Sequence, residues 1–397
     1  MTAELPDLAA WAALARGWPI ELGPRWLAAE WARVTPRSAL AFGARAAASW
    51  LLVDGSEQRT GYVACDLVLG PDLDDALRDA GRTTPADLAR CAGARDRAAP
   101  LRTARTATIT TISSYFPGIV WDVGLAAADA ETAARRVVEQ VAAAAQPQGA
   151  AVVAVANVPD AERFAPLRAA LAGLGMVRTA VAPDSELAVV PGGLPAYTSA
   201  LRASMRPPVR REQREFARAI DRVVVEDAAR LRAPDLVPLL AAHHGKYGHA
   251  DAQAAFCDRL ARTSSHGDHV RVLVAEQAGR ALGFIALVLD PPLGPPLGEA
   301  PGRLVPRLFA CADNDVFAYF NLVFYEPVRV AAAWGYAAIS LGSTAYRAKL
   351  LRGARLLPRS TWLLPLDPGL RGLIADAAAY RSELEAARRD ALAGLER

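Results

Sequence analysis

Short apolar runs, alternating with amphipathic segments, give the chain the pattern of an α/β protein. In the first half the pattern predicts strands over 49–53, 62–69, 106–115, 150–156 and 177–190, and helices over 131–145 and 161–172. The first two strands are expected to form a hairpin across the polar turn at 54–57. The second half predicts helices over 235–244 and 251–262, a hairpin of 270–276 with 281–289, and then a long strand, a helix and a strand. This repeated order predicts two mixed α/β domains, at residues 1–193 and 194–397.

The long strand predicted in the second half covers residues 316–325, which are rich in aromatic and β-branched side chains. A helix from Pro327 to Trp334 and a short strand over 337–341 are expected to follow it. In a strand, Tyr319, Asn321 and Tyr325 would share one face. An amide between two tyrosines on a covered strand suggests the floor of a cleft. Alternatively, these side chains bond to neighbouring backbone or lie on an exposed face.

Length and composition narrow the class of protein. A chain of 397 residues is longer than one hydrophobic core usually accommodates, and a hydrophobic content of 52% excludes a disordered chain. The chain does not open on a basic segment followed by an apolar run, and it contains no uninterrupted apolar run of about 18 residues. We therefore expect a cytoplasmic protein without a membrane span. The four cysteines lack metal-ligand spacing, so we expect buried thiols and no metal site.

The identity of the basic residues is more informative than their number. Among 45 lysines and arginines, only Lys246 and Lys349 are lysine, which indicates a local need for a compact ammonium at these positions, with chance retention as the alternative. Residues 201–223 carry seven arginines against three acidic residues. Such a basic segment usually forms the solvated face of a helix. Beside a cleft, it can also bind phosphate-rich ligands.

Four motifs stand out in the second half. They are Arg210-Arg211-Glu212, Lys246-Tyr247-Gly248-His249, residues 319–327 (YFNLVFYEP) and residues 346–354 (YRAKLLRGA). Together they resemble the GNAT-type acyltransferases, in particular the Fem-type peptidyltransferases and related actinobacterial proteins of peptidoglycan biosynthesis. The first half is similar only in the order of its elements. The resemblance implies tandem GNAT-type domains, with a degenerate first domain, and an acyltransferase that forms amide bonds in cell-wall or natural-product biosynthesis.

Acyl transfer to an amine needs a neutral nucleophile, stabilisation of an oxyanion and a proton for the leaving atom. Lys349 is the candidate for stabilising phosphate or the oxyanion. Asn321 and Tyr325 would position the substrate, and Tyr325 could donate the proton. His249 or His243 would act as the base, although each could equally be a packed or capping histidine. The residues expected to contact substrate or tRNA are Lys246, Tyr247, His243, Tyr319, Tyr346, Arg352, Arg210, Arg211 and Arg214.

The segment after the expected long strand bears on the acyl donor. In GNAT enzymes that use acetyl-CoA, a glycine-rich loop at this point holds the pyrophosphate with backbone N–H groups. Here the segment contains Glu326 and Pro327 and no glycine. Fem-type enzymes use aminoacyl-tRNA, so the resemblance implies charged tRNA as donor, a small-molecule amine as acceptor and no tightly bound cofactor. The alternatives are an acyl-CoA-dependent N-acyltransferase and a non-catalytic ligand-binding protein.

Overall fold

The structure is a computed structural model of the chain. It describes residues 8–19, 22–24, 26–28, 38–54, 63–111, 116–246, 254, 257, 260–261, 269–290, 302–312 and 316–395. The chain forms two compact units: unit 1 comprises residues 1–184, 343–347 and 356–397, and unit 2 comprises residues 185–342 and 348–355. The end of the chain therefore belongs to unit 1. The predicted division at residue 193 instead assigns the whole second half to one domain.

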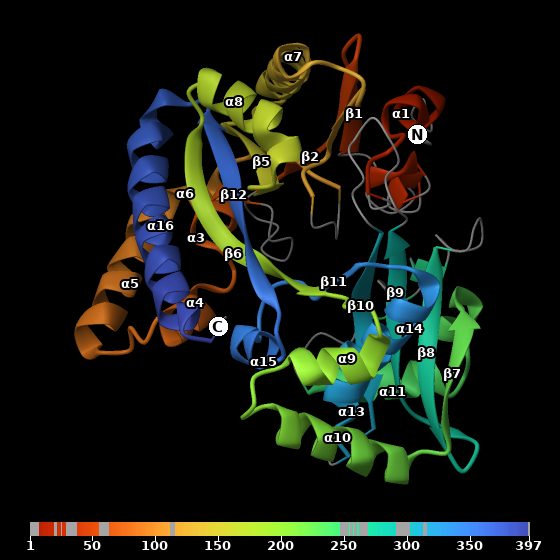
Figure 1. The fold of residues 1–397 in the computed structure, drawn as a ribbon. Coiled ribbons are helices and arrows are strands. Elements are labelled where there is room, and N and C mark those ends of the chain that lie inside the picture. Colours follow the sequence, from red (N-terminus) through yellow and green to blue (C-terminus); the bar gives the residue numbers. More distant parts are fainter. Residues whose placement is uncertain are drawn as a thin grey trace. The chain divides into compact units, whose positions relative to one another are not determined.

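The strands of unit 1 lie in the order β1-β2-β3-β5-β12-β6, and β4 pairs with β2 (Figure 1). The strands are β1 (Ser38–Phe42), β2 (Ala46–Val53), β3 (Thr106–Ile109), β4 (Ile119–Trp121), β5 (Val152–Pro159), β6 (Val177–Ala188) and β12 (Arg355–Pro365). The helices are α1 (Leu8–Leu14), α3 (Ala64–Leu69), α4 (Leu73–Asp79), α5 (Pro85–Arg97), α6 (Pro100–Thr103), α7 (Ala127–Ala145), α8 (Ala165–Gly173) and α16 (Arg371–Ala393). Short 3-10 helices cover Gln146–Gln148, Glu162–Phe164 and Pro368–Leu370.

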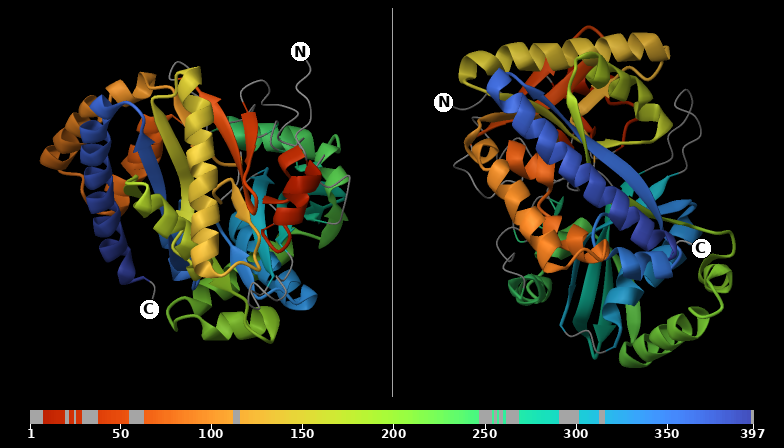
Figure 2. Two further views of the ribbon diagram at one scale, coloured as in Figure 1. Left: turned by 90° about the horizontal axis from the view of Figure 1, so that it is seen from above. Right: turned by 90° about the vertical axis from the view of Figure 1, so that its left-hand side faces the viewer.

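Helices cover both faces of the unit 1 sheet. Successive residues of β5 point to opposite faces. Val153 and Val155 pack in a buried cluster with residues of α7 and α8, whereas Val152 and Ala154 pack with residues of α3, α4, α5 and α16. Helix α16 runs beside α3, α4 and α5 (Figure 2). Burial on both faces explains why β5 reads as a continuous run of valine and alanine.

The strands of unit 2 lie in the order β6-β11-β10-β9-β8-β7, where β6 is the end of the strand that begins in unit 1. The further strands are β7 (Arg222–Asp227), β8 (Val270–Gln277), β9 (Arg280–Asp290), β10 (Arg303–Cys311) and β11 (Ala338–Ser340). The helices are α9 (Gly193–Ala200), α10 (Arg206–Ala219), α11 (Leu236–Gly245), α13 (Ala318–Phe320), α14 (Glu326–Trp334) and α15 (Tyr346–Leu351), which begins in unit 1. A 3-10 helix, η4, covers Ala228–Arg232, and a π-helix, η5, covers Asn321–Tyr325.

A helical layer covers one face of the unit 2 strands. Val209 of α10, Leu322 of η5 and Val328 of α14 pack in one buried cluster with Leu273 of β8 and Leu287 of β9. Helix α11 contacts β9 and β10, and η4 contacts β8. The core of unit 2 thus holds α10 and the helix formed by α13, η5 and α14 against the middle strands.

The two units repeat one pattern of strand directions. In unit 1, β1-β2 and β2-β3 are antiparallel and β3-β5 is parallel. In unit 2, β8-β9 and β9-β10 are antiparallel and β10-β11 is parallel. The connection between the parallel strands contains α7 in unit 1 and the helix of α13, η5 and α14 in unit 2. The mixed α/β class and the repeated order predicted from the sequence are therefore confirmed.

The prediction of a long strand over residues 316–325 is wrong. Residues 318–334 form one continuous helix with η5 as a π-helical segment, and the strand before this helix is β10. Every residue of η5 is buried, and periodicity cannot distinguish a short buried helix from a buried strand. Glu326 and Pro327 therefore lie inside a helix and do not form the loop whose lack of glycine counted against CoA.

The hairpin predicted from residues 49–53 and 62–69 is also wrong. The antiparallel partner of β2 is β1, and residues 64–69 form helix α3. The helices predicted over 131–145, 161–172 and 235–244 and the hairpin over 270–289 are confirmed as α7, α8, α11 and the pair of β8 and β9. The helix predicted over 251–262 falls mainly outside the described residues.

Candidate functional site

The parallel strands β10 and β11 separate soon after they meet. Their register contains two pairs, Arg303 with Ala338 and Leu304 with Ile339, and β10 then continues to Cys311. On its other edge, β10 remains paired with β9 as far as Cys311. A strand that leaves its neighbour in this way offers its edge to side chains or to a ligand.

Side chains from α11 and α13 meet around the end of β10. The His243 ring lies edge-on to the Phe309 ring, with 5.1 Å between centroids, and its Nδ1 is 3.8 Å from the Cys311 sulfur. The Nε2 atom of His244 is 3.0 Å from the Phe309 carbonyl oxygen. Tyr319 contacts the same Phe309 ring at 5.4 Å. We call these five residues the β10-end cluster.

The electrostatics of the β10-end cluster suit a proton acceptor. Burial lowers the pKa of His243, and the charges of His244 and Lys246 lower this pKa further. A hydrogen bond with the Cys311 backbone raises it in part. Because the ordinary pKa of histidine is about 6.5, the imidazole is neutral at pH 7. Burial raises the pKa of Tyr319, so its hydroxyl keeps its proton. A neutral base and a hydroxyl donor are two groups that acyl transfer to an amine requires.

A buried ionic network joins α10 and η5 to Arg352, the residue that follows α15. Arg352 Nη2 lies 2.7 Å and 2.9 Å from the two carboxylate oxygens of Glu212, and the two side chains are 5% and 9% exposed. The Tyr325 hydroxyl donates to Glu212, and Arg352 Nε donates to the Tyr325 oxygen at 3.0 Å. The Arg352 guanidinium also lies 3.5 Å from the centroid of the Phe320 ring. The structure thus brings the predicted residues Tyr325 and Arg352 together, but with Glu212 and each other as partners.

Asn321 is buried beside this network. Its Nδ2 donates to the backbone oxygens of Glu212 at 3.1 Å and Phe317 at 3.0 Å. This is the arrangement given above as the alternative to a cleft floor, an amide that bonds to neighbouring backbone. The amide thereby ties the start of the η5 helix to α10.

Lys349 is buried and bonds to the backbone that follows β11. Its Nζ donates to the carbonyl oxygens of Leu341 at 2.7 Å and Gly342 at 2.9 Å. A compact ammonium with three donors can bridge adjacent carbonyls, whereas a planar guanidinium does not fit the same space. This contact gives a structural reason for lysine here, and the role of Lys349 in stabilising phosphate or oxyanion stays a prediction.

Tyr346 contacts residues of unit 1. Its hydroxyl donates to the Pro183 carbonyl oxygen at 2.8 Å, and its ring centroid is 5.3 Å from the Arg388 guanidinium carbon. Burial raises the pKa of Tyr346. The predicted role of Tyr346 as a substrate contact stays a prediction.

Helix α10 has one buried face and one basic face. The buried residues are Val209, Glu212 and Phe216. The exposed arginines are Arg210, Arg211, Arg214 and Arg218. Pro207 and Pro208 lie in the first turn, where proline suits a helix, so they start α10 and do not interrupt it.

The motif at the end of α11 is described in part. Lys246 is exposed directly after α11. Tyr247 and His249 lie outside the described residues, so their predicted roles as substrate contact and base stay predictions. Of the two histidines considered as base, His243 is the one whose surroundings the structure gives.

Sequence reasoning missed Glu212, Phe309 and Cys311 as parts of the site. Glu212 was quoted only as part of a motif, although an acidic residue three positions from Val209 and four from Phe216 shares their helix face. Residues 304–312 are apolar apart from Arg307, and the polar residues 313–315 follow them. This change from apolar to polar residues is the signal in the sequence for the end of β10.

None of the helices that the structure describes is long and apolar enough to cross a membrane. No protein-family model and no curated protein sequence matches the chain.

Solved structures of similar architecture exist. L-PGS from Bacillus licheniformis is 9% identical over 96% of this chain and 97% of its own, with a TM-score of 0.49. A tandem GNAT protein from the clavulanic acid biosynthesis pathway is 11% identical over 91% of this chain and 94% of its own, with a TM-score of 0.43. A C-terminal domain assigned to a lysylphosphatidylglycerol synthetase from Agrobacterium fabrum is 15% identical over 70% of this chain and 81% of its own, with a TM-score of 0.45. At such identities and scores, the similarity decides neither the family nor the substrate of this chain.

Proposed function

We propose that the chain is an acyltransferase that forms an amide bond on a small amine, with aminoacyl-tRNA as the acyl donor. The amine nitrogen attacks the carbonyl carbon of the ester that joins the amino acid to the tRNA ribose. A C–N bond forms, the ester C–O bond breaks, and the amine proton passes through a base to the leaving ribose oxygen. The base in this proposal is His243.

The observation that carries the proposal is the β10-end cluster. An amine attacks only in its neutral form, so the site needs a group that accepts a proton at neutral pH. His243 is such a group, because burial lowers its pKa. Tyr319 contacts the same Phe309 ring and keeps its hydroxyl proton, so it is the candidate hydrogen-bond donor to the developing oxyanion. Both lie where β10 continues without β11.

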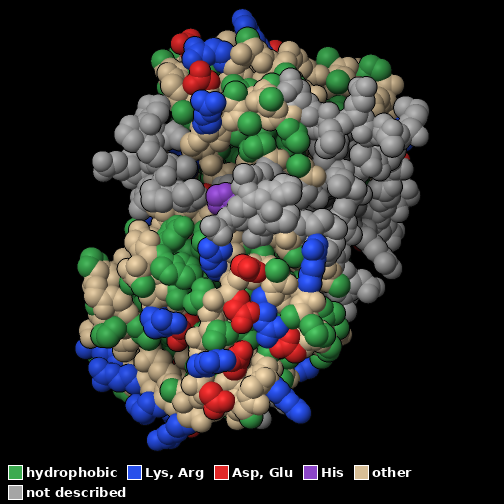
Figure 3. All heavy atoms as spheres, turned by 90° about the vertical axis from the view of Figure 1, so that its right-hand side faces the viewer, with side chains coloured by type: hydrophobic (Ala, Val, Ile, Leu, Met, Phe, Trp, Pro, Cys, Tyr) green, Lys and Arg blue, Asp and Glu red, His purple; other side chains and the backbone are tan. Residues whose placement is uncertain are grey.

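The donor is proposed from the charge of α10. Its exposed face carries four arginines, of which Arg218 pairs with Glu215 at 3.2 Å. In the middle of the lower half of Figure 3, by contrast, basic and acidic side chains are interspersed. Arg222 and Glu276, on β7 and β8, pair at 2.8 Å. A local basic stripe of this kind suits a polyanion such as tRNA.

The segment that follows β10 also favours tRNA over CoA. Residues 312–317 read ADNDVF and contain two aspartates and no glycine; residues 313–315 lie outside the described part of the chain. Phe317, directly before α13, has a φ of 57°, a left-handed conformation that is costly for a bulky residue. In sequence, this segment therefore lacks the glycines of a loop that holds a pyrophosphate with backbone N–H groups.

Binding of tRNA is expected to weaken steeply with salt and to depend on α10. Each neutralised phosphate releases counterions, so replacing Arg210 and Arg214 together with alanine should lower the slope of log K against log salt by about 0.7 to 0.9 per lost contact. Filter binding of deacylated tRNA between low and moderate salt measures this slope. Arg280→Ala, an exposed arginine on β9, is the matched control and should leave the slope unchanged. Equal slopes for the double variant and the wild type would show that α10 does not bind tRNA.

A further inference from the structure

Unit 1 contains a pocket that the proposed reaction does not use. Its volume is about 340 Å³, within the lower range of small-molecule sites. It lies between α16, β6, the start of β12 and Asp160 at the end of β5. Residues of these elements also form an apolar wall, which contains Ala180, Val181, Pro183, Leu356 and Pro358.

The charged residues that line the pocket are mainly arginines. They are Arg178, Arg359, Arg388 and Arg389, against Asp160 and Glu385, which gives a formal charge of +4 − 2 = +2. Arg178 Nη2 is 3.3 Å from both carboxylate oxygens of Asp160. Arg389 is exposed at α16, and Arg359 is buried on β12. The cations thus come from three strands or helices and meet at one cavity.

Arg388 is the most deeply buried of these cations, with 1% of its side chain exposed. Its Nη1 lies 3.0 Å from Asp72 and 3.1 Å from Glu385, and its Nε lies 3.4 Å from Asp79. Its Nη2 is buried without a hydrogen-bond partner among the described residues. A buried guanidinium N–H without an acceptor is costly, and a bound anion would supply the acceptor.

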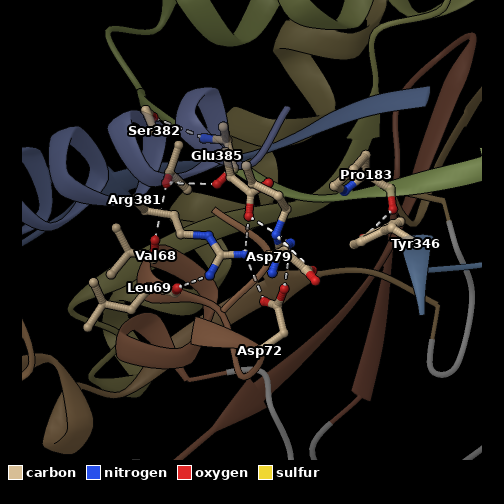
Figure 4. Close-up of polar contacts among 12 residues, drawn as sticks. Val68, Leu69, Asp72, Asp79, Pro183, Tyr346, Arg381, Ser382 and Glu385 are labelled. Atoms are coloured by element: carbon tan, nitrogen blue, oxygen red, sulfur yellow. Dashed lines mark hydrogen bonds and ion pairs between the residues drawn. The ribbon is translucent and has the colours of Figure 1, made fainter. Parts of the chain in front are cut away.

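A second guanidinium holds this arrangement in place. Arg381 is fully buried and donates to the Leu69 carbonyl at 2.8 Å and to Asp72 at 2.8 Å, and it lies 2.5 Å from Glu385 (Figure 4). Adding Arg381, Asp72 and Asp79 to the lining residues gives +2 + 1 − 2 = +1. The carboxylates therefore do not cancel the positive charge around the pocket. They orient Arg388, whose position is fixed before any ligand enters.

We infer that this pocket binds a small organic phosphate, with Arg388, Arg389 and Arg359 contacting the phosphate oxygens and the apolar wall holding the organic part. A tetrahedral phosphate presents oxygens in several directions and so suits guanidinium groups that approach from α16 and β12, whereas a planar carboxylate suits one guanidinium fork. The site lies within unit 1 and shares no residue with the β10-end cluster or with α10, so it goes beyond the proposed reaction and does not depend on it.

Calorimetric titration of the full chain with phenyl phosphate tests the inference, with benzoate as the planar anion of similar size and ionic strength held constant. We expect phenyl phosphate to bind with one-to-one stoichiometry and benzoate to bind at least about tenfold more weakly. Arg389→Glu is expected to weaken phenyl phosphate binding by about tenfold or more, because it replaces an attractive rim charge with a repulsive one. Arg178→Ala leaves the Asp160 carboxylate in the pocket without its partner and should weaken binding in the same direction.

Two controls locate the binding. Arg136→Glu reverses an exposed charge on α7, outside the pocket, and should leave the affinity unchanged. The double replacement of Arg210 and Arg214 should also leave it unchanged, which separates this site from the tRNA surface. Absence of binding to the folded wild type, equal affinity for benzoate, or equal weakening by Arg136→Glu would each overturn the inference.

Discussion

Replacing His243 with asparagine is expected to lower kcat for amide formation by about 100-fold or more, the usual range for loss of a general base. Asparagine keeps a polar side chain of similar reach, but it cannot accept a proton from the attacking amine. Initial rates at saturating donor and acceptor measure the loss. The free energy of unfolding should change little, because the His243 side chain is only partly buried.

The pH profile separates a base from a packing residue. The pKa of His243 is below its ordinary value, so the neutral form is present at pH 7 and is lost as the pH falls through that lowered pKa. The wild-type rate should therefore fall on the acid side below about pH 6.5. The His243→Asn variant should lack this limb in its residual rate.

His244 provides the matched control. It lies next to His243 on α11, and its Nε2 contacts the Phe309 carbonyl oxygen. We expect His244→Asn to lower kcat by less than about tenfold, because His244 is not the proposed base and a lost hydrogen bond is worth about 1 kcal/mol. A His243→Asn enzyme with near-normal kcat, or one that keeps the acid limb, would contradict the assignment of the base.

Arg352→Ala is expected to lower the free energy of unfolding by about 3–5 kcal/mol. Removing one partner of a buried ion pair leaves the other charge buried and uncompensated. Here that charge is Glu212, which would keep the hydrogen bond from the Tyr325 hydroxyl and lose both contacts with the guanidinium. Urea unfolding followed by circular dichroism measures the difference.

Arg355→Ala is the control for this variant. Arg355 pairs with Glu186 at 2.7 Å, but its side chain is 70% exposed, and exposed pairs contribute about 0–1 kcal/mol. We expect this variant to lose less than about 1 kcal/mol. If Arg352→Ala is no more destabilising than Arg355→Ala, the Glu212 network does not hold α10 against the η5 helix.

Much of the fold could be predicted because several elements carry clear local signals. The hairpin of β8 and β9 has two β-branched runs around a short turn at Ala278 and Gly279, and α7 has apolar residues at helical spacing. Residues 316–325 carry no such signal. Residues 321–325 are all buried, so no polar face marks the helical period, and β-propensity then gave the wrong element.

The sequence motifs named some residues that the structure brings together, and their roles stay predictions. The motifs placed Tyr325, Arg352 and Asn321 among functional residues, and the structure brings the three together around Glu212. Their partners could not be predicted, because Glu212 lies 113 positions from Tyr325 and 140 from Arg352 along the chain. The β10-end cluster depends on where β10 ends and on how α11 returns to it. Neither follows from local pattern.

The exchange of chain segments between the units was beyond prediction from the sequence. The start of β12 and the end of β6 carry no residue that marks a change of unit. Likewise, the pocket of unit 1 combines Asp160, Arg178, Arg359 and Arg388 from four parts of the chain. Only the paired strands and α16 bring them together.

Transfer of a labelled amino acid from charged tRNA to a panel of small primary amines tests the central claim most directly. Three donors are compared at equal concentration: intact aminoacyl-tRNA, the same preparation after ribonuclease treatment, and acyl-CoA. We expect amide product with intact aminoacyl-tRNA, loss of the product after ribonuclease treatment, and no product from acyl-CoA. Turnover that survives ribonuclease treatment and rises with acyl-CoA concentration would contradict the proposed donor.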